Sequence, residues 1–272
     1  EMLKEIEEKS KKLALGLNVK GLLNIQFAIK DEELFILEAN PRASRTMPFV
    51  AKVTGNQIIK AGTLLMLGYS IDEVRNKTKY LSSSSNKVAI KKAIFPWSRF
   101  PAEDTMLGPE MKATGEVLGV GKEFGTALNK AYAAAGVEIN NKEKGIFVTL
   151  SDSEKPNFIK TVNKYLELGF TLYSTEGTGK YLKTNGIGSV IVGKADDLGQ
   201  TSLTIIEDKL VSLVINTPTY ANELSDGWKI RRLSHETGVA VVSSVREADA
   251  FIEAFLNQNL VLDDLEVIQD VS

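Results

Sequence analysis

Cysteine is absent from this sequence of 272 residues, and histidine occurs once, at position 235. The lack of cysteine excludes disulfides, thiol nucleophiles and zinc–thiolate sites. A single histidine also excludes a metal site built from several imidazoles. Neither charge is in excess, since 33 Lys and Arg residues oppose 35 Asp and Glu residues, so we expect no nucleic-acid partner bound through a basic surface. The remaining chemistry must use carboxylates, amides, lysine, arginine and the backbone.

Long apolar runs are also missing. No run approaches the 18 residues that a membrane-spanning helix needs, and no signal peptide is visible, so we expect a cytoplasmic protein without a membrane partner. Hydrophobic residues make up 43% and charged residues 25% of the chain, which is typical of a globular protein. The length suggests one or two domains.

The first half of the chain predicts helices around a β-hairpin. Residues 1–17 have the apolar spacing of an amphipathic helix, and two apolar strands, 22–29 and 34–39, flank a polar turn. A hairpin on one helix is not a complete sheet, so we expect a part of a longer chain. Further on, the pattern predicts helices at 46–54, 56–68, 70–76 and 122–135, a strand at 87–95, and a largely irregular segment at 96–121.

The second half alternates regularly between strands and helices. The composition turns polar at residues 136–144, and we place a domain boundary there, giving domains 1–138 and 139–272. Alternating elements predict an α/β fold with a doubly wound parallel five-stranded sheet. The expected strands are 145–150, 170–173, 189–192, 211–215 and 239–242, and the expected helices are 155–168, 178–185, 200–207, 226–236 and 246–257.

Ligands of such sheets bind beyond the carboxyl ends of the strands. Residues 175–179 follow a strand and open a helix, where free amides bind phosphate. The same residue types are common as helix caps, and lone lysines are usually solvated, so that interpretation stays open. The convergence of four strand-end loops favours a site for a phosphorylated ligand, with five candidate residues: Lys155, Thr175, Thr178, Lys194 and Asn216.

The hairpin carries a second candidate site. Pairing it around Glu32 places Gln26 opposite Glu38 on one sheet face, and Asn40 shares that face. One carboxylate and two amide oxygens suit Mg²⁺, although this spacing also occurs in ordinary solvated turns. Just beyond lie Arg42 and Arg45, which could neutralise phosphate oxygens.

These residues carry a family resemblance. Segments 24–27 and 37–46 resemble the closing segment of an ATP-grasp domain, and more narrowly that of the carbamoyl-phosphate synthase large subunit. Segments 48–55 and 107–119 resemble its continuation, and the resemblance extends over the whole chain. It implies a partial ATP-grasp lobe (1–138), from the unit that phosphorylates carbamate, followed by a methylglyoxal synthase-like allosteric domain (139–272).

In that family the complete enzyme is a ligase that makes carbamoyl phosphate from bicarbonate, ammonia released from glutamine, and ATP. The resemblance implies Mg²⁺ or Mn²⁺ held by Gln26, Glu38 and Asn40, with Arg45 and, less strongly, Arg42 contacting phosphate. It implies as partners the glutaminase small subunit and the rest of the large subunit, in an oligomeric enzyme. The present segment should hold half of the site and not catalyse alone.

The resemblance also specifies an effector. The five strand-end residues fall where the family binds the phosphate and ribose of a nucleotide, and Thr217 adjoins them. A lysine at position 194 is typical of relatives regulated by pyrimidine nucleotides, so we expect UMP. Lys92 stands near a glutamate that contributes to ornithine binding in some relatives, and therefore ornithine is not expected.

Two other functions remain as alternatives. The chain could be a stand-alone nucleotide-binding regulatory module, or a methylglyoxal synthase acting on triose phosphate. The latter needs an aspartate and a histidine near the phosphate, whereas Thr217 stands where the acid should be. His235 lies too far along the following helix to serve, and its polar surroundings predict a surface residue.

Overall fold

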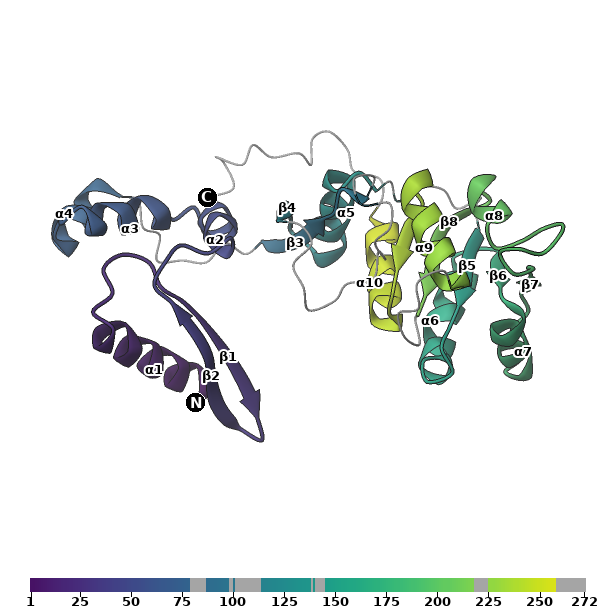
Figure 1. Cartoon of the computed structure of the whole chain (residues 1–272), viewed down its shortest axis with the longest axis horizontal. Coiled ribbons are helices and arrows are strands. Elements are labelled where there is room, and N and C mark those ends of the chain that lie inside the picture. The colour runs from purple at the N-terminus through teal and green to yellow at the C-terminus, as the bar shows by residue number, and fades with distance from the viewer. Residues whose placement is uncertain are drawn as a thin grey trace. The chain divides into compact units, whose positions relative to one another are not determined.

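A computed structural model of the chain (Figure 1) contains two compact units, one within residues 1–86 and one within residues 87–261. Part of the sequence signature at 107–119 lies outside the described residues, which are 1–78, 87–97, 100, 114–137, 139, 145–217 and 225–257.

The first unit is built on the predicted hairpin. Helix α1 (Met2–Gly16) contacts strand β2 (Glu33–Asn40), which pairs antiparallel with β1 (Asn24–Lys30). Both residues of the connecting loop have positive φ, 50° for Asp31 and 63° for Glu32. This backbone is typical of the tight hairpin turns whose twist matches the strands. The three predicted short helices follow as α2 (Thr46–Thr54), α3 (Ile58–Met66) and α4 (Ile71–Lys77).

The second unit begins with an antiparallel pair, β3 (Val88–Ile94) and β4 (Gly115–Gly121). The expectation of irregular structure up to residue 121 was therefore wrong for β4. Its glycines lower the strand propensity, but they are needed for packing. A side chain at Gly119 would collide with the backbone of helix α5 (Phe124–Ala134), so glycine lets the strand and helix approach closely.

The predicted five-stranded parallel sheet forms the centre of this unit, with strand order β7-β6-β5-β8-β9. Helices cover both of its faces (Figure 1). Alternate β5 residues face two separate cores: Ile146 and Val148 meet α6 and α10, whereas Phe147 meets α8 and α9. The fold is thus doubly wound, as predicted, and its elements are β5 (Gly145–Thr149), α6 (Lys155–Glu167), β6 (Leu172–Ser174), α7 (Glu176–Thr184), β7 (Val190–Ile191), α8 (Thr204–Glu207), β8 (Val211–Asn216), α9 (Asp226–Thr237), β9 (Ala240–Val242) and α10 (Val245–Leu256).

Helix α5 packs against α10 within the same unit. The rings of Tyr132 and Phe251 meet edge-on at 5.2 Å, and the side-chain amide of Asn129 donates to the backbone oxygen of Asn257 at 2.7 Å. Because of this contact, the second unit includes α5, which precedes the polar segment at 136–144 in the sequence. The domain boundary at residue 138 rests on composition and resemblance, and it stays a prediction.

No helix among the described residues combines the length and the apolar character that a membrane span requires.

Candidate functional site

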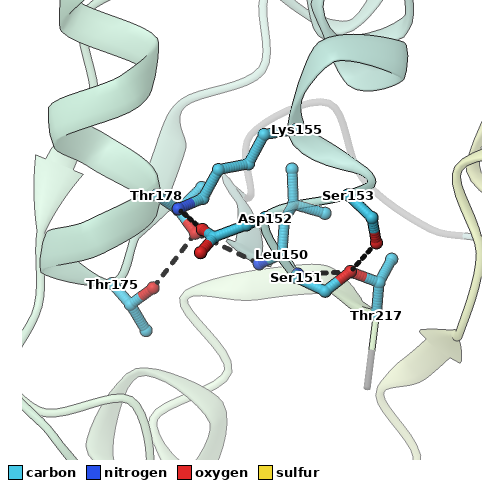
Figure 2. Close-up of polar contacts among 8 residues, drawn as sticks. All are labelled: Leu150, Ser151, Asp152, Ser153, Lys155, Thr175, Thr178 and Thr217. Carbon is cyan, nitrogen blue, oxygen red and sulfur yellow. Dashed lines mark hydrogen bonds and ion pairs between the residues drawn. The ribbon is translucent and has the colours of Figure 1, made fainter. Parts of the chain in front are cut away.

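Three strand-end loops meet through hydroxyl groups (Figure 2). Thr178 accepts a hydrogen bond at Oγ1 from the backbone N–H of Leu150 (3.1 Å), and Thr175 donates to the same oxygen (3.2 Å). Thr217 accepts from the N–H of Ser151 at 2.8 Å. The candidate hydroxyls therefore join the segments that follow β5, β6 and β8, because Thr178 and Thr217 each accept from a backbone N–H after β5 and Thr175 bonds to Thr178.

The Lys155 ammonium lies beside these hydroxyls and contacts Asp152, with 2.6 Å between Nζ and Oδ1 (Figure 2). The lysine side chain is only 13% exposed, whereas that of Asp152 is 95% exposed. The hydrogen bond from Lys155, followed by its positive charge, lowers the pKa of the Asp152 carboxyl. Within the protein, this carboxylate holds the cation that was predicted to bind phosphate.

Asn216 ends β8 and is held by a buried arginine. Arg231 of α9 donates from a guanidinium nitrogen to the Asn216 side-chain oxygen at 2.8 Å, and both residues are buried. Gly227 leaves room for this contact, since a side chain there would lie 3.1 Å from the guanidinium. Because its oxygen accepts from Arg231, the N–H₂ group is the remaining donor of the Asn216 amide, and among the described residues none accepts a hydrogen bond from it.

A cavity of about 1140 Å³ opens at this end of the sheet. Of the six predicted effector residues, Thr175 and Lys194 line it, while Lys155, Thr178, Asn216 and Thr217 are not among the described lining residues. Thr178 nevertheless bonds directly to Thr175. The sequence interpretation missed other lining residues, namely Thr149, Lys180, Lys183, Asp197 and Asp226.

The spacing of two basic residues of this cavity is visible in the sequence. Lys180 and Lys183 stand three apart on α7, so they share one helix face. Together with Lys194 they give the cavity three lysines, which three carboxylates of the same lining oppose, those of Glu176, Asp197 and Asp226. Lys180 pairs with Glu176 at 2.7 Å. The wall also includes Gly177 and Gly188, at which an added side chain would meet no atom within 4 Å. Such a wall leaves space for an anion and offers backbone amides to it.

The hairpin brings the predicted metal ligands together. Gln26 pairs directly with Glu38, as predicted, because the register shifts by one residue between Gln26 and Phe27. Asn40 follows two residues later and shares the Glu38 face. Among the described residues, no hydrogen bond engages the side-chain oxygens of these three residues, and the Glu38 side chain is exposed. Oxygen donors of this kind fit Mg²⁺ or Mn²⁺.

The two candidate arginines follow the hairpin on exposed backbone. Arg45 immediately precedes helix α2, and the side chain of Arg42 donates to the backbone oxygen of Ala43 at 3.2 Å. Both guanidinium groups keep donors available for a phosphate group.

A second cavity, of about 320 Å³, lies between β3, α5, α9 and α10. Among its lining residues are Lys92, Trp97, Tyr132, His235 and Glu247. The Lys92 ammonium lies 4.3 Å from the centre of the Tyr132 ring, and burial lowers its pKa although the Glu247 charge raises it.

The expectation that His235 is a surface residue was wrong. The imidazole is half-buried, and its centre lies 5.7 Å from that of the Trp97 ring. Burial, and next the positive charges of Lys92, Arg232 and Arg231, lower the pKa of His235 to about 4. The polar helix sequence concealed this burial, because Trp97 comes from a distant part of the chain.

Two regions of the chain match known families. Residues 157–243 match the MGS-like domain, and residues 1–74 match the carbamoyl-phosphate synthase L chain ATP-binding domain. The chain is also 38% identical to the "Carbamoyl phosphate synthase large chain, C-terminal section" of Aquifex aeolicus, over 93% of this chain and 50% of that relative.

The chain is a relative of the carbamoyl-phosphate synthase large chain, over its C-terminal section. The same section of Methanocaldococcus jannaschii is 37% identical over 93% of this chain and 42% of that relative. The large chain of Brucella suis is 40% identical over 93% of this chain and 22% of that relative. This chain thus spans half or less of each of these synthase sequences, and the resemblance inferred from its motifs is confirmed.

Proposed function

We propose that the chain supplies part of an ATP-dependent ligase that makes carbamoyl phosphate from bicarbonate, ammonia and ATP. The observation that carries this proposal is the direct pairing of Gln26 with Glu38, two residues before Asn40. These oxygens would hold Mg²⁺ or Mn²⁺ against the ATP phosphates, and the metal would supply charge neutralisation there. Arg45 and Arg42 would bind phosphate oxygens. The glutaminase small subunit and the rest of the large chain would complete an oligomeric enzyme.

The second part of the proposal is that residues 145–257 bind UMP as a regulatory effector. The cavity of about 1140 Å³ lined by Thr175 and Lys194 supports it, as do Lys155 and the donor group of Asn216 nearby. The lining holds three lysines but also the carboxylates of Glu176, Asp197 and Asp226, so the preference for an anionic ligand rests on Lys194 and on the nearby Lys155. Thr178 and Thr217 would act mainly by fixing the loops that surround the phosphate.

Calorimetric titration of the chain with UMP, IMP and N-acetylglutamate tests the effector assignment. We expect UMP to bind most tightly, and Lys194→Met to weaken its binding. Tighter binding of N-acetylglutamate than of UMP would overturn the assignment, which depends on the lysine at position 194.

A stand-alone regulatory module is the second candidate, and one observation favours it. The unit within residues 87–261 has its own two cores and both cavities, so the binding function does not depend on the hairpin. A methylglyoxal synthase is disfavoured, because Thr217 donates to and accepts from Ser151 where that enzyme needs an acid.

A further inference from the structure

The loop that carries Lys194 is closed by a side chain of its own. The backbone N–H of Lys194 donates to Asp197 Oδ2 at 2.7 Å, and the N–H of Asp197 donates back to the Lys194 oxygen at 3.2 Å. Residues 194–197 therefore form a turn in which backbone and side chain both fix the backbone of Lys194. Local side-chain bonds of this kind are typical of aspartate in turns.

The residue before the turn leaves space for this contact. A side chain at Gly193 would lie 3.1 Å from both Cβ and Oδ2 of Asp197. Gly193 is also paired at its backbone, since its N–H donates to Gln200 and its oxygen accepts from the N–H of Ser202, each at 3.0 Å. The base of the loop is thus closed by backbone bonds, and the turn at its start is closed by Asp197.

A neighbouring carboxylate ties the same turn to another wall of the cavity. Both oxygens of Asp196 contact the Lys229 ammonium of α9, at 2.8 and 2.6 Å. Helix α9 contributes Asp226 and Gly227 to the cavity lining. The two adjacent aspartates therefore have different contacts: Asp196 links the turn to α9, whereas Asp197 sets the backbone conformation at Lys194.

We infer that Asp197 is a positioning residue for the Lys194 ammonium in binding a phosphorylated ligand, and this inference rests on the effector site proposed above. A lysine side chain is long and loses considerable rotamer freedom when it is fixed. Because the backbone at Lys194 is already fixed, only the torsions of the lysine side chain remain to be ordered when a ligand binds. The smaller loss of conformational entropy favours affinity. The Asp197 carboxylate, which lines the cavity, contributes through its acceptor oxygen and not through its charge.

Two substitutions separate these contributions. Asp197→Asn and Asp197→Ala both remove the negative charge, but only asparagine keeps an oxygen that can accept from the Lys194 N–H. We expect calorimetry to show that Asp197→Asn binds UMP at least as tightly as the wild type. Asp197→Ala should bind about five-fold or more weakly than Asp197→Asn, as expected for one hydrogen bond. Asp208→Ala, an exposed carboxylate outside the cavity lining, serves as the control.

The same pair in a Lys194→Met background tests whether Asp197 acts through the lysine. The difference between asparagine and alanine should disappear there. A difference that persists would indicate a general effect on the fold and would overturn the inference. Equal UMP affinity of Asp197→Asn and Asp197→Ala, with binding weakened by Lys194→Met, would overturn the inference alone. If Lys194→Met leaves UMP affinity unchanged, the proposed role of Lys194 fails, and the positioning role fails with it.

Discussion

Thr178 shows how one hydroxyl can serve the fold at a proposed ligand site. Its type and its place before a helix predicted a phosphate contact, but its partners could not be inferred. The structure gives it two neighbours, Leu150 and Thr175, and leaves it 2% exposed. A residue type and its spacing therefore predict where a site lies, whereas the partner of each group depends on the loops that the fold brings together.

Thr178→Ala should weaken both the fold and UMP binding. It leaves the buried N–H of Leu150 without its acceptor, which costs about 1–3 kcal/mol of stability. The loops that would surround the phosphate lose the bonds that fix them, and a loss of about the same 1–3 kcal/mol in binding predicts roughly ten-fold weaker UMP affinity. Urea unfolding and UMP calorimetry measure the two effects. Thr178→Ser keeps the oxygen and should stay near wild type in both, so equal damage in both variants would contradict this role.

Asp152→Asn should strengthen binding of the effector phosphate. The Asp152 carboxylate holds the Lys155 ammonium, and an incoming phosphate must compete with it. Since the aspartate is exposed, the expected gain in UMP affinity is small, about two- to five-fold. Calorimetry at low salt measures it, and the gain should shrink as salt screens the pair. Weaker binding in Asp152→Asn would show that the carboxylate positions Lys155 for the ligand.

Glu38→Gln should cripple carbamoyl phosphate synthesis in a complete synthase that contains this segment. It removes the only carboxylate among the three proposed ligands, and with it the charge that would hold Mg²⁺. Folding should persist, because the change is nearly isosteric and the side chain is exposed. Steady-state synthesis and a thermal unfolding scan test both expectations, with Glu33→Gln, an exposed residue at the start of β2, as control. Unimpaired synthesis would mean that the metal is bound elsewhere.

At the scale of elements, periodicity predicted most of the helices and all five parallel strands. The hairpin shows what periodicity leaves out. Its symmetric pairing around Glu32 placed Gln26 opposite Glu38, whereas the strands actually turn at Asp31–Glu32 and recover that pair through a register shift. Strand β4 was missed because its glycines, which fit against α5, lack the side chains that mark a strand.

The surroundings of His235 in helix α9 predict that the stability of the fold depends on pH. His235 is faced by Lys92 from β3, by Arg231 and Arg232 on its own helix, and by Glu247 of α10 across the cavity. Its pKa is about 4 in the folded protein, below the value of about 6.5 expected when unfolded. As the pH falls, the unfolded chain therefore takes up the proton first. The contribution of the neutral His235 to the free energy of unfolding is complete above pH 6.5 and is lost as the pH falls towards 4.

Urea unfolding between pH 7 and pH 4.5 tests this. Where only the unfolded histidine is protonated, the free energy of unfolding should fall by about 1.4 kcal/mol per pH unit from this group. His235→Gln removes the contribution, while the carboxylates that also titrate are common to both proteins. The difference between wild type and variant should therefore grow as the pH falls, and parallel curves would contradict the buried placement of His235.

For the whole molecule, the two units differ in how much apolar surface they bury. Among the described apolar side chains of residues 1–78, only Leu34 and Val74 are buried. The unit within residues 87–261 contains two extended cores. Composition could not reveal this difference, since both halves contain regular helices and apolar strands. Nor could it reveal that α5 packs on α10, because that contact joins residues more than 100 positions apart, such as Asn129 and Asn257.

This asymmetry leads to a prediction about catalysis by residues 1–272 alone. The proposed metal and phosphate ligands, one carboxylate, two amides and two arginines, all lie on one hairpin or directly after it, and among the described residues Glu38, Arg42 and Arg45 are exposed. We therefore expect phosphate release from ATP, with bicarbonate and ammonia present, to stay at background, while UMP still binds. A malachite-green assay and calorimetry on the same preparation measure both. The control is Glu38→Ala: turnover by the wild-type chain that this substitution abolishes would show that one hairpin and its helices suffice for the chemistry.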